Sequence, residues 1–290
     1  MACATSDSTN LYWVNTSGAL VSVAQASGLL NVLATEPAPA PTGTVPSLCS
    51  VVQSGAGFYE VSASAFAINH VGDVSDAGGG GAPVIAEGAS SVVATGTGSV
   101  WVTQPQMNRI SQCAVPNRTE DDSCMPGVVL SGLAQPDNLI GDAENLYWID
   151  RGDGTIMRSS KTTLAASVVV PAADADILLT PQQMTLATSS AGKTRLFWTT
   201  LSGAAAINVD GSGYTALQNN PTFESGAGIA SDGVNVYWAN EGGLNKAPAM
   251  GGTPVVLAAP TGVNGASFVV VVSGNVYWQD NDENVWVAPK

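Results

Sequence analysis

The residues of this chain best suited to chemistry are carboxylates and carboxamides in short turns. Two turns are especially acidic: Asp150-Arg151-Gly152-Asp153-Gly154 and Asp280-Asn281-Asp282-Glu283. Their oxygens can accept hydrogen bonds from a hydroxylated ligand or coordinate Ca²⁺, which takes about six to eight oxygen ligands. The spacing of Asp150 and Asp153 does not match the EF-hand pattern. Because Asp, Asn and Gly are also common turn formers, a purely structural role is the alternative.

Catalysis by acid–base or nucleophilic groups has little support, because His70 is the only histidine. It lies in the segment 66–70, whose pattern predicts a strand and not a turn. A Ser-His-Asp triad needs three converging groups, and no Gly-x-Ser-x-Gly motif occurs. His70 is therefore a weak catalytic candidate, and we expect a non-enzymatic protein. A lyase or hydrolase with a metal site is the alternative.

The elements that must position these turns repeat seven times along the chain. Each copy is a short apolar strand with one or two aromatic residues, at Tyr12-Trp13, Phe58-Tyr59, Trp101, Tyr147-Trp148, Phe197-Trp198, Tyr237-Trp238 and Tyr277-Trp278. The interval of about 40 to 50 residues is typical of one four-stranded blade of a β-propeller. Because no helical apolar period occurs, we predict an all-β, seven-bladed propeller with antiparallel blades, in a single domain of residues 1–290. Six blades are the alternative, since Phe58-Tyr59 is the most degenerate copy.

One repeat can be divided into four strands, A to D. In the sixth copy we expect strands at 228–231, 235–239, 244–248 and 253–258, separated by Gly- and Asn-rich turns. Residues 5–15 align without gaps with residues 230–240, and Asp142 and Asn145 precede Tyr147 at the same offsets. The last copy contains only three strands, so its blade is either incomplete or closed by the N-terminal segment.

The repeat resembles a known family of sequences. The pattern Asn-(Leu/Val)-Tyr-Trp after an Asp turn, followed by Thr-Pro-Val-Val-Leu-Ala at 253–258, is similar to the YWTD-type repeat of lipoprotein-receptor ectodomains. It is still more similar to repeats of secreted bacterial propellers, and the resemblance covers nearly the whole chain. It implies a propeller fold and little about chemistry, because propellers have many functions. Receptor propellers of this type have six blades, one fewer than the copies counted here.

The aromatic pairs have a structural interpretation. Each blade lies between two neighbours, so we expect one ring of a pair to pack against the preceding blade and the other against the following blade. The same packing is expected of Trp13, Trp101, Trp148, Trp198, Trp238 and Trp278. Trp286 is outside this pattern, in the third strand of the last copy, and is a candidate for partial exposure.

Propeller geometry places the turns on two faces. The B–C and D–A connections share the face that usually holds the ligand around the channel mouth. On it we place Asp137, Asn138, Asp150, Arg151, Asp153, Gln182, Gln183, Glu241, Asn264, Asp280 and Asp282. We predict that this acidic, carboxamide-rich face binds a glycan, a small molecule or a protein. No cofactor is expected, with Ca²⁺ as the alternative.

The four cysteines form two plausible pairs. Cys113 and Cys124 enclose a polar loop, and Cys3 and Cys49 each precede the first aromatic of their copy by the same offset. We predict disulfides Cys113–Cys124 and Cys3–Cys49, which form in oxidising compartments. The short Cys/His spacings of zinc sites are absent from the sequence. A secreted, cell-surface or periplasmic location follows as an expectation.

The charge balance excludes some partners. The chain has 9 Lys and Arg against 23 Asp and Glu, a net charge of −14. Nucleic-acid binding needs a basic surface, so we expect no nucleic-acid partner. No apolar run approaches the ~20 residues of a membrane-spanning helix, so we expect no membrane insertion. We also expect a monomer.

Overall fold

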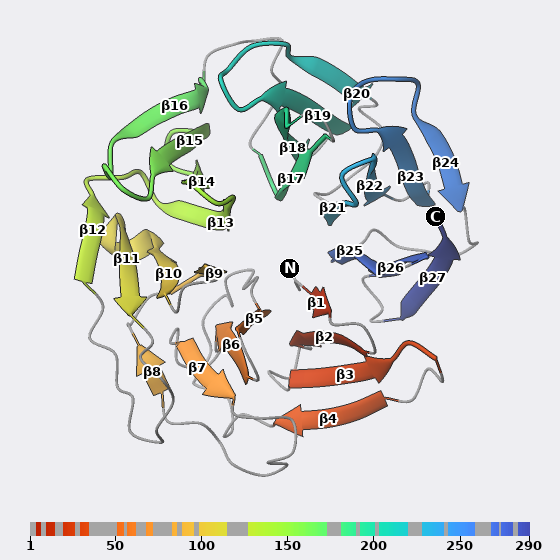
Figure 1. Cartoon of the computed structure of the whole chain (residues 1–290), viewed down its shortest axis with the longest axis horizontal. Helices are drawn as coiled ribbons and strands as arrows, with labels where there is room; N and C mark the ends of the chain where they lie inside the picture. The colour runs from red at the N-terminus through yellow and green to blue at the C-terminus, as the bar shows by residue number, and fades with distance from the viewer. Residues whose placement is uncertain are drawn as a thin grey trace. The chain divides into compact units, whose positions relative to one another are not determined.

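The computed structural model shows an all-β protein (Figure 1). It describes residues 4–6, 10–14, 20–26, 30–34, 51–54, 57–61, 68–71, 83–85, 89–95, 99–114, 127–172, 181–189, 192–200, 203–219, 228–240, 243–258, 268–272, 274–280 and 284–290. Within these ranges there is no α-helix, and the only helical turn is the 3₁₀ helix η1 (Pro105–Met107). No helix in the described part of the chain is long and apolar enough to cross a membrane.

The chain divides into two compact units, Met1–Gly152 with Ser160–Ala166, and Asp153–Ser159 with Ser167–Lys290. The first unit contains three complete antiparallel sheets. Their strands are β1 (Ala4–Ser6), β2 (Asn10–Val14), β3 (Leu20–Ala24) and β4 (Leu30–Ala34); β5 (Val51–Ser54), β6 (Gly57–Val61), β7 (Ile68–Val71) and β8 (Pro83–Ile85); and β9 (Ser91–Thr95), β10 (Ser99–Gln104), β11 (Arg109–Ala114) and β12 (Gly127–Ser131).

A fourth sheet contains the boundary between the units. Its strands, in spatial order, are β13 (Pro136–Gly141), β14 (Asn145–Asp150), β15 (Thr155–Ser160) and β16 (Ala166–Val170). Within the first unit, β1 contacts β5, β5 contacts β9, and β9 contacts β13. The first strands of successive sheets therefore lie side by side, and the fourth strands β4, β8 and β12 are the outermost (Figure 1).

The second unit contains two more four-stranded sheets and one of three strands. Their strands are β17 (Met184–Thr188), β18 (Thr194–Thr200), β19 (Gly203–Asn208) and β20 (Thr215–Asn219); β21 (Ile229–Ser231), β22 (Asn235–Asn240), β23 (Gly243–Pro248) and β24 (Val255–Ala258); and β25 (Phe268–Val272), β26 (Asn275–Gln279) and β27 (Val285–Pro289). Here β17 contacts β21, and β21 contacts β25. The four strands expected in the sixth copy are confirmed as β21 to β24.

Every aromatic copy lies in the second strand of its sheet: β2, β6, β10, β14, β18, β22 or β26. The two rings of a pair point to opposite sides, as successive side chains of a strand must. Trp238 packs in a cluster with Phe197 and Ala206 of the preceding sheet. Tyr237 packs in another cluster with Val269 and Trp278 of the following sheet. The expected sharing of each pair between two neighbouring sheets is confirmed here.

Small residues make room for these rings. Strand β19 has the sequence Gly-Ala-Ala-Ala-Ile-Asn, and its Ala204 and Ala206 belong to the cluster of Trp238. Short side chains on one sheet and a bulky ring on the next fill the space between them at the density of a protein interior.

The buried Arg195 joins two sheets of the second unit by hydrogen bonds to uncharged acceptors. Its Nη1 donates to Ala249 O at 3.2 Å, and its Nη2 donates to Gly213 O and Thr215 Oγ1, both at 3.1 Å. Burial lowers the pKa of this guanidinium. The contacts give Arg195 a structural role at the turns after β19 and β23.

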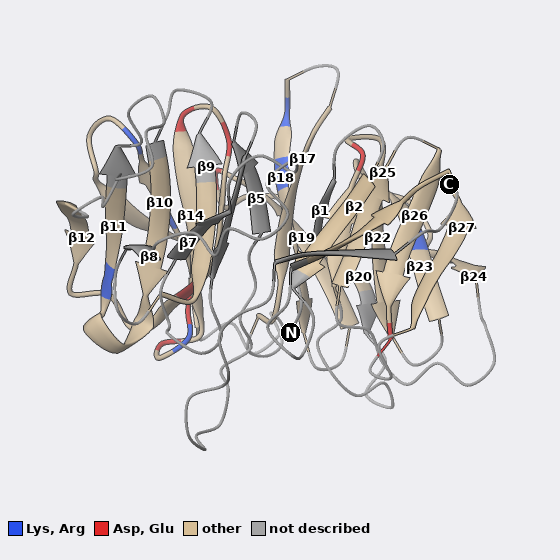
Figure 2. Ribbon diagram, turned by 90° about the horizontal axis from the view of Figure 1, so that it is seen from below, with Lys and Arg blue, Asp and Glu red and all other residues tan. Residues whose placement is uncertain are grey.

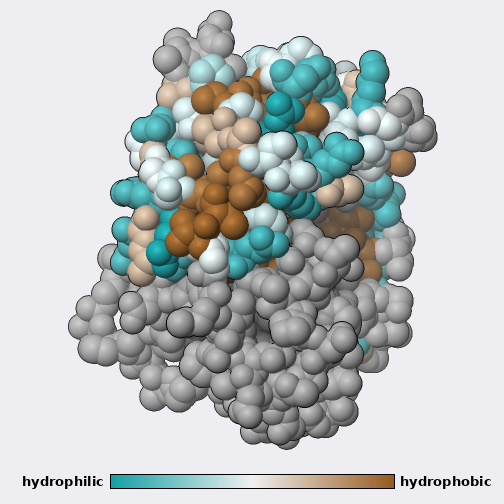
Figure 3. Space-filling view, turned by 60° about the vertical axis from the view of Figure 1, so that its left-hand side comes forward, coloured by the Kyte–Doolittle hydropathy of each residue, from teal (hydrophilic) through white to brown (hydrophobic). Residues whose placement is uncertain are grey.

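Charged residues are sparse on the described surface, and the acidic ones are mostly at strand ends and in turns (Figure 2). The outer strands instead expose valines, among them Val128 of β12, Val168 of β16, and Val255 and Val256 of β24. On the face drawn in Figure 3, apolar side chains gather between hydrophilic ones.

Candidate functional site

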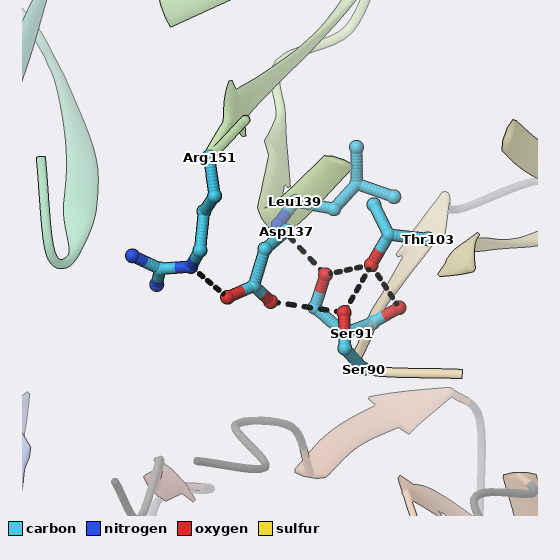
Figure 4. Close-up of polar contacts among 6 residues, drawn as sticks. All are labelled: Ser90, Ser91, Thr103, Asp137, Leu139 and Arg151. Atoms are coloured by element: carbon cyan, nitrogen blue, oxygen red, sulfur yellow. Dashed lines mark hydrogen bonds and ion pairs between the residues drawn. The ribbon is translucent and has the colours of Figure 1, made fainter. Parts of the chain in front are cut away.

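The clearest polar cluster in the described part of the first unit connects the third sheet to the start of the fourth (Figure 4). Its centre is Asp137 of β13, whose side chain is 12% exposed. Ser90 Oγ donates to Asp137 Oδ1 at 2.9 Å, and Arg151 Nε donates to Asp137 Oδ2 at 2.5 Å. The Arg151 side chain is 28% exposed, so the ion pair lies at the boundary between the interior and solvent.

A second layer of hydroxyls holds Ser90 and Asp137 in place. Thr103 Oγ1 is 3.0 Å from Ser90 Oγ and 2.5 Å from Ser91 Oγ. Ser91 and Thr103 are almost completely buried. Because buried hydroxyls with several partners have few alternative rotamers, this layer fixes the position of the carboxylate.

A β-bulge gives Asp137 its orientation. The register between β13 and β14 shifts between Asp137 and Ile140, and Asn138 has a left-handed φ of 49°. The bulge allows Leu139 N to donate to Ser91 Oγ at 2.9 Å (Figure 4). Bulges of this kind redirect side chains and are common beside functional sites.

The turn that carries Arg151 is fixed by backbone hydrogen bonds. Arg151 N donates to Gln135 O at 3.2 Å, and Gly152 N donates to Ala134 O at 2.8 Å. Asn108, after η1, accepts from Gln135 N through its side chain at 3.1 Å and from Leu133 N through its carbonyl at 3.0 Å. These hydrogen bonds link three connections of the predicted ligand face in the first unit: 104–109, 132–135 and 151–152.

The next polar group on this face is Gln104, which is buried and orients its own turn. Gln104 Oε1 accepts from Arg109 Nε at 2.7 Å and from Ser111 Oγ at 2.8 Å. The side chains of Gln106, Met107 and Asn108, in and after η1, are exposed beside it. The exposed side chains of this turn carry amide and thioether groups.

Two of the predicted face residues serve mainly as internal acceptors. Asp150 is 4% exposed and accepts from Trp148 Nε1 at 3.0 Å. Asp280 is 1% exposed and accepts from Trp286 Nε1 at 2.8 Å and from Asn284 N at 2.8 Å. The sequence marks both as acidic turn residues, but each carboxylate is directed at a tryptophan of its own sheet. They stabilise the turns and present little surface to a ligand.

The other predicted residues are distributed between the two units. Asn138, Gln182 and Gln183 are buried or half-buried, and Asp153 is exposed in a turn of the second unit. Glu241, Asn264 and Asp282 lie outside the described residues, as do Cys3, Cys49 and Cys124. Cys113 is in β11, opposite Val100. No cluster of three or more His, Cys, Asp or Glu residues that could hold a metal occurs among the described residues.

His70 is in β7, the third strand of its sheet, opposite Tyr59. The prediction that this histidine lies in a strand is confirmed. Sequence reasoning missed Ser90, Ser91 and Thr103, because isolated hydroxyl residues in or beside a strand give no signal of the side chains and backbone groups of other strands that they bond to.

The structure also explains the repeated Asp and Asn before Tyr-Trp. Asp232 Oδ1 accepts from Val234 N at 3.0 Å and Asn235 N at 2.7 Å, while its Oδ2 accepts from the Tyr237 hydroxyl at 3.1 Å. Asp142 makes the equivalent contacts with Glu144 N, Asn145 N and the Tyr147 hydroxyl, at 2.9, 2.7 and 2.9 Å. The motif therefore closes the turn between the first two strands and anchors the tyrosine.

The shifted pKa values of Asp232 and Tyr237 make the free energy of unfolding depend on pH. Burial alone would raise the pKa of Asp232, but hydrogen bonds from Asn235, Val234, Lys290 and Tyr237 outweigh it and lower the pKa. Burial, followed by the charge and hydrogen bond of Asp232, raises the pKa of Tyr237 to about 12. Asp232 contributes to the free energy of unfolding above its unfolded-state pKa of about 3.9. This contribution is lost as pH falls through the lower pKa that Asp232 has in the folded protein. Tyr237 contributes to the free energy of unfolding below pH about 10, the pKa of tyrosine in the unfolded chain. This contribution is lost as pH rises through the folded-state pKa of about 12.

We expect Tyr237→Phe to lower the free energy of unfolding by about 1–2 kcal/mol at pH 7, because a hydrogen bond to a charged group is lost. The difference from the unmodified protein should shrink as pH rises from 10 towards 12. Urea unfolding followed by fluorescence at several pH values measures both effects. Tyr277→Phe is the matched control, since Val272 stands where three other repeats have Asp7, Asp142 and Asp232. An equal loss in both variants would contradict this role of Asp232.

Comparison with solved structures identifies the class of fold. The chain is similar to β-propeller proteins, while no protein-family model matches its sequence. A search of curated proteins found no matching sequence either.

Three solved structures illustrate the similarity. A streptogramin B lyase has a TM-score of 0.71 at 13% identity, over 99% of this chain and 93% of that one. BamB from Moraxella catarrhalis has a TM-score of 0.60 at 16% identity, over 96% and 79%. A nidogen/laminin complex has a TM-score of 0.58 at 14% identity, over 83% and 90%. At such identities the likeness establishes the fold and not the activity.

Proposed function

We propose that the chain is a single seven-bladed β-propeller that acts as a non-enzymatic binding module. Its ligand would bind at the connections that carry Asp137 and Arg151, with the glutamine and asparagine side chains of the neighbouring turns around it. The seven antiparallel sheets of the described residues and the likeness to propellers support the architecture. The observation that carries the binding function is the partly exposed Arg151–Asp137 ion pair, whose carboxylate also accepts a hydrogen bond from Ser90.

The chemistry of this pair favours a ligand with several hydroxyl groups, such as a glycan, over an anion. The Arg151 guanidinium can donate while the Asp137 carboxylate accepts, so adjacent hydroxyls of one ligand can bind both groups. A carboxylate has about four acceptor positions, and Ser90 and Arg151 use one each. The net charge of −14 disfavours an anionic ligand. A protein loop with hydroxyl side chains is a partner of the same chemistry.

The surroundings of the module follow from the cysteines and the charge. We propose disulfides Cys113–Cys124 and Cys3–Cys49, and with them a secreted, cell-surface or periplasmic monomer that does not bind nucleic acid. Four free thiols under non-reducing mass spectrometry would contradict the disulfides and the location. The proposal needs no cofactor, and Ca²⁺ at the acidic turns is a variant that calcium titration by calorimetry can test.

We expect Arg151→Met to weaken glycan binding by at least about tenfold, which corresponds to one charge-assisted hydrogen bond. Because the Asp137 carboxylate is only 12% exposed and loses its cation, the melting temperature should also fall, so binding is measured well below it. A glycan array, followed by calorimetry with the best ligand, measures the effect. Lys193→Met removes an equal charge from the turn between β17 and β18 and should bind normally. Unchanged binding by Arg151→Met would reject this site.

A metal-dependent lyase is the second candidate, because a streptogramin B lyase shares the fold. In another similar structure, a virginiamycin B lyase from Staphylococcus aureus, a histidine-to-alanine variant is described as catalytically inactive. His70 lies in β7, the third strand of its sheet, and not in one of the turns that carry Asp137 and Arg151, which favours binding over this reaction. Turnover of quinupristin, the compound present in that lyase structure, that is lost in His70→Ala would replace the binding module with an enzyme.

A further inference from the structure

Left-handed backbone conformations gather around the Asp137–Arg151 ion pair (Figure 4). In the described part of the chain, four residues other than glycine have a positive φ: Asn108 (52°), Gln135 (57°), Asn138 (49°) and Leu164 (54°). The first three lie in or beside the connections that hold the ion pair, whereas Leu164 lies between β15 and β16. Such strain persists only where surrounding contacts enforce it, and it is common at binding sites.

Gln135 is the member of this group whose conformation its own sequence supports least. Asparagine adopts left-handed backbone more readily than other residues with a Cβ atom, which accounts for Asn108 and Asn138. Gln135 lacks this tolerance, and it precedes Pro136, whose ring favours an extended conformation in the residue before it. Leu164 is half-buried, so the packing of its side chain offsets part of its strain. Gln135 is exposed and has no such compensation from burial.

Hydrogen bonds hold Gln135 in this conformation directly beside the ion pair. Its N–H donates to Asn108 Oδ1 at 3.1 Å, and its C=O accepts from Arg151 N at 3.2 Å. The preceding residue packs closely on the same turn, since a Cβ atom at Gly152 would lie 3.2 Å from both Cβ and O of Ala134. The exposed Gln135 is thus fixed two residues before the carboxylate of the ion pair and against the turn that carries the guanidinium.

The chemistry of the Gln135 amide complements that of the two charged groups. The Asp137 carboxylate only accepts hydrogen bonds and the Arg151 guanidinium only donates them, whereas an amide does both. On the basis of the binding function proposed above, we infer that Gln135 is a specificity-determining residue of the same site. Its amide binds a third hydroxyl group, next to the two that the ion pair binds. This narrows the ligand from any diol to a sugar with three neighbouring hydroxyl groups, as in a pyranose ring.

Two substitutions separate the amide from the backbone conformation. Gln135→Gly removes the amide and relieves the strain, because glycine adopts positive φ freely, so the melting temperature should stay the same or rise by up to about 3 °C. Gln135→Ala removes the amide and keeps the strain. The probe is whichever of methyl α-glucopyranoside, methyl α-galactopyranoside and methyl α-mannopyranoside binds best in calorimetry. We expect both variants to bind it about fivefold more weakly, the effect of one uncharged hydrogen bond.

Monodeoxy forms of the same sugar identify the hydroxyl group that Gln135 binds. Removal of that hydroxyl should weaken binding to the unmodified protein about fivefold and leave binding to Gln135→Gly unchanged, because the variant has already lost the contact. The other monodeoxy forms should lose affinity equally for both proteins. Leu164→Gly is the matched control, since it relieves strain away from the site and should bind like the unmodified protein.

The outcomes distinguish this inference from the binding function on which it rests. Normal binding by Gln135→Gly, with Arg151→Met still weakened, would overturn the inference alone. Weak binding by Gln135→Ala that Gln135→Gly restores would also overturn it, because the strained conformation would then serve only the backbone. If the unmodified protein bound none of the three sugars at millimolar concentration, the proposed function would fail and the inference with it.

Discussion

Replacing Trp238 with alanine is expected to lower the free energy of unfolding by about 3–5 kcal/mol, the usual cost of removing a large buried aromatic side chain. The ring is almost completely buried between the sheets β17–β20 and β21–β24. Its neighbours there include Ala204 and Ala206, which are too short to fill the cavity. Urea unfolding followed by circular dichroism measures the loss.

Two variants calibrate this result. Trp238→Phe keeps an aromatic ring at the site and should cost less than the alanine variant. Val234→Ala removes a side chain that is 72% exposed in the turn before the same strand, and should change stability by less than about 0.5 kcal/mol. A cost below 1 kcal/mol for Trp238→Ala would mean that the aromatic pair does not hold neighbouring sheets together.

Gly228→Ala is expected to destabilise the protein by about 3 kcal/mol, at the upper end of the range for overpacking. A Cβ atom at this position would lie 2.2 Å from Val269 N and 2.4 Å from Phe268 C. Both contacts are backbone atoms of β25, so rotation of a side chain cannot relieve them. The sheets would have to move apart where their first strands meet.

Gly274→Ala is the matched control for this substitution. A Cβ there would have no other atom within 4 Å, and the backbone does not need the left-handed region. We expect a change of less than about 0.5 kcal/mol. Thermal unfolding of the two variants side by side measures the difference, and similar midpoints would exclude the close approach at Gly228.

The all-β class and the place of the aromatic copies could be read from the sequence. Tyr147-Trp148 and Tyr237-Trp238 lie at the same position in the second strand of their sheets, and a repeated packing surface needs side chains of similar volume at that position. The turns are also recognisable, because Asp142 and Asp232 bond to backbone groups two and three residues further on. These are local or strictly repeated interactions, and both leave a pattern in one chain.

The candidate site could be read only in part. The acidic turns pointed to Asp137 and Arg151, but equally to Asp150 and Asp280, whose carboxylates are buried against tryptophans. The hydroxyls of Ser90 and Thr103 left no signal, because their partners are distant in the sequence.

The period of the aromatic pairs alone was sufficient to establish the repeating four-stranded sheets, since a repeated packing surface needs repeated residues. Folding decided which carboxylates reach the surface and which groups hold Asp137. Asp137 is held by Ser90, which is 47 positions away in the sequence, so the pattern of residues around Asp137 does not show this contact. Burial is a property of the neighbours that a residue acquires on folding, and the identity of the residue does not encode it.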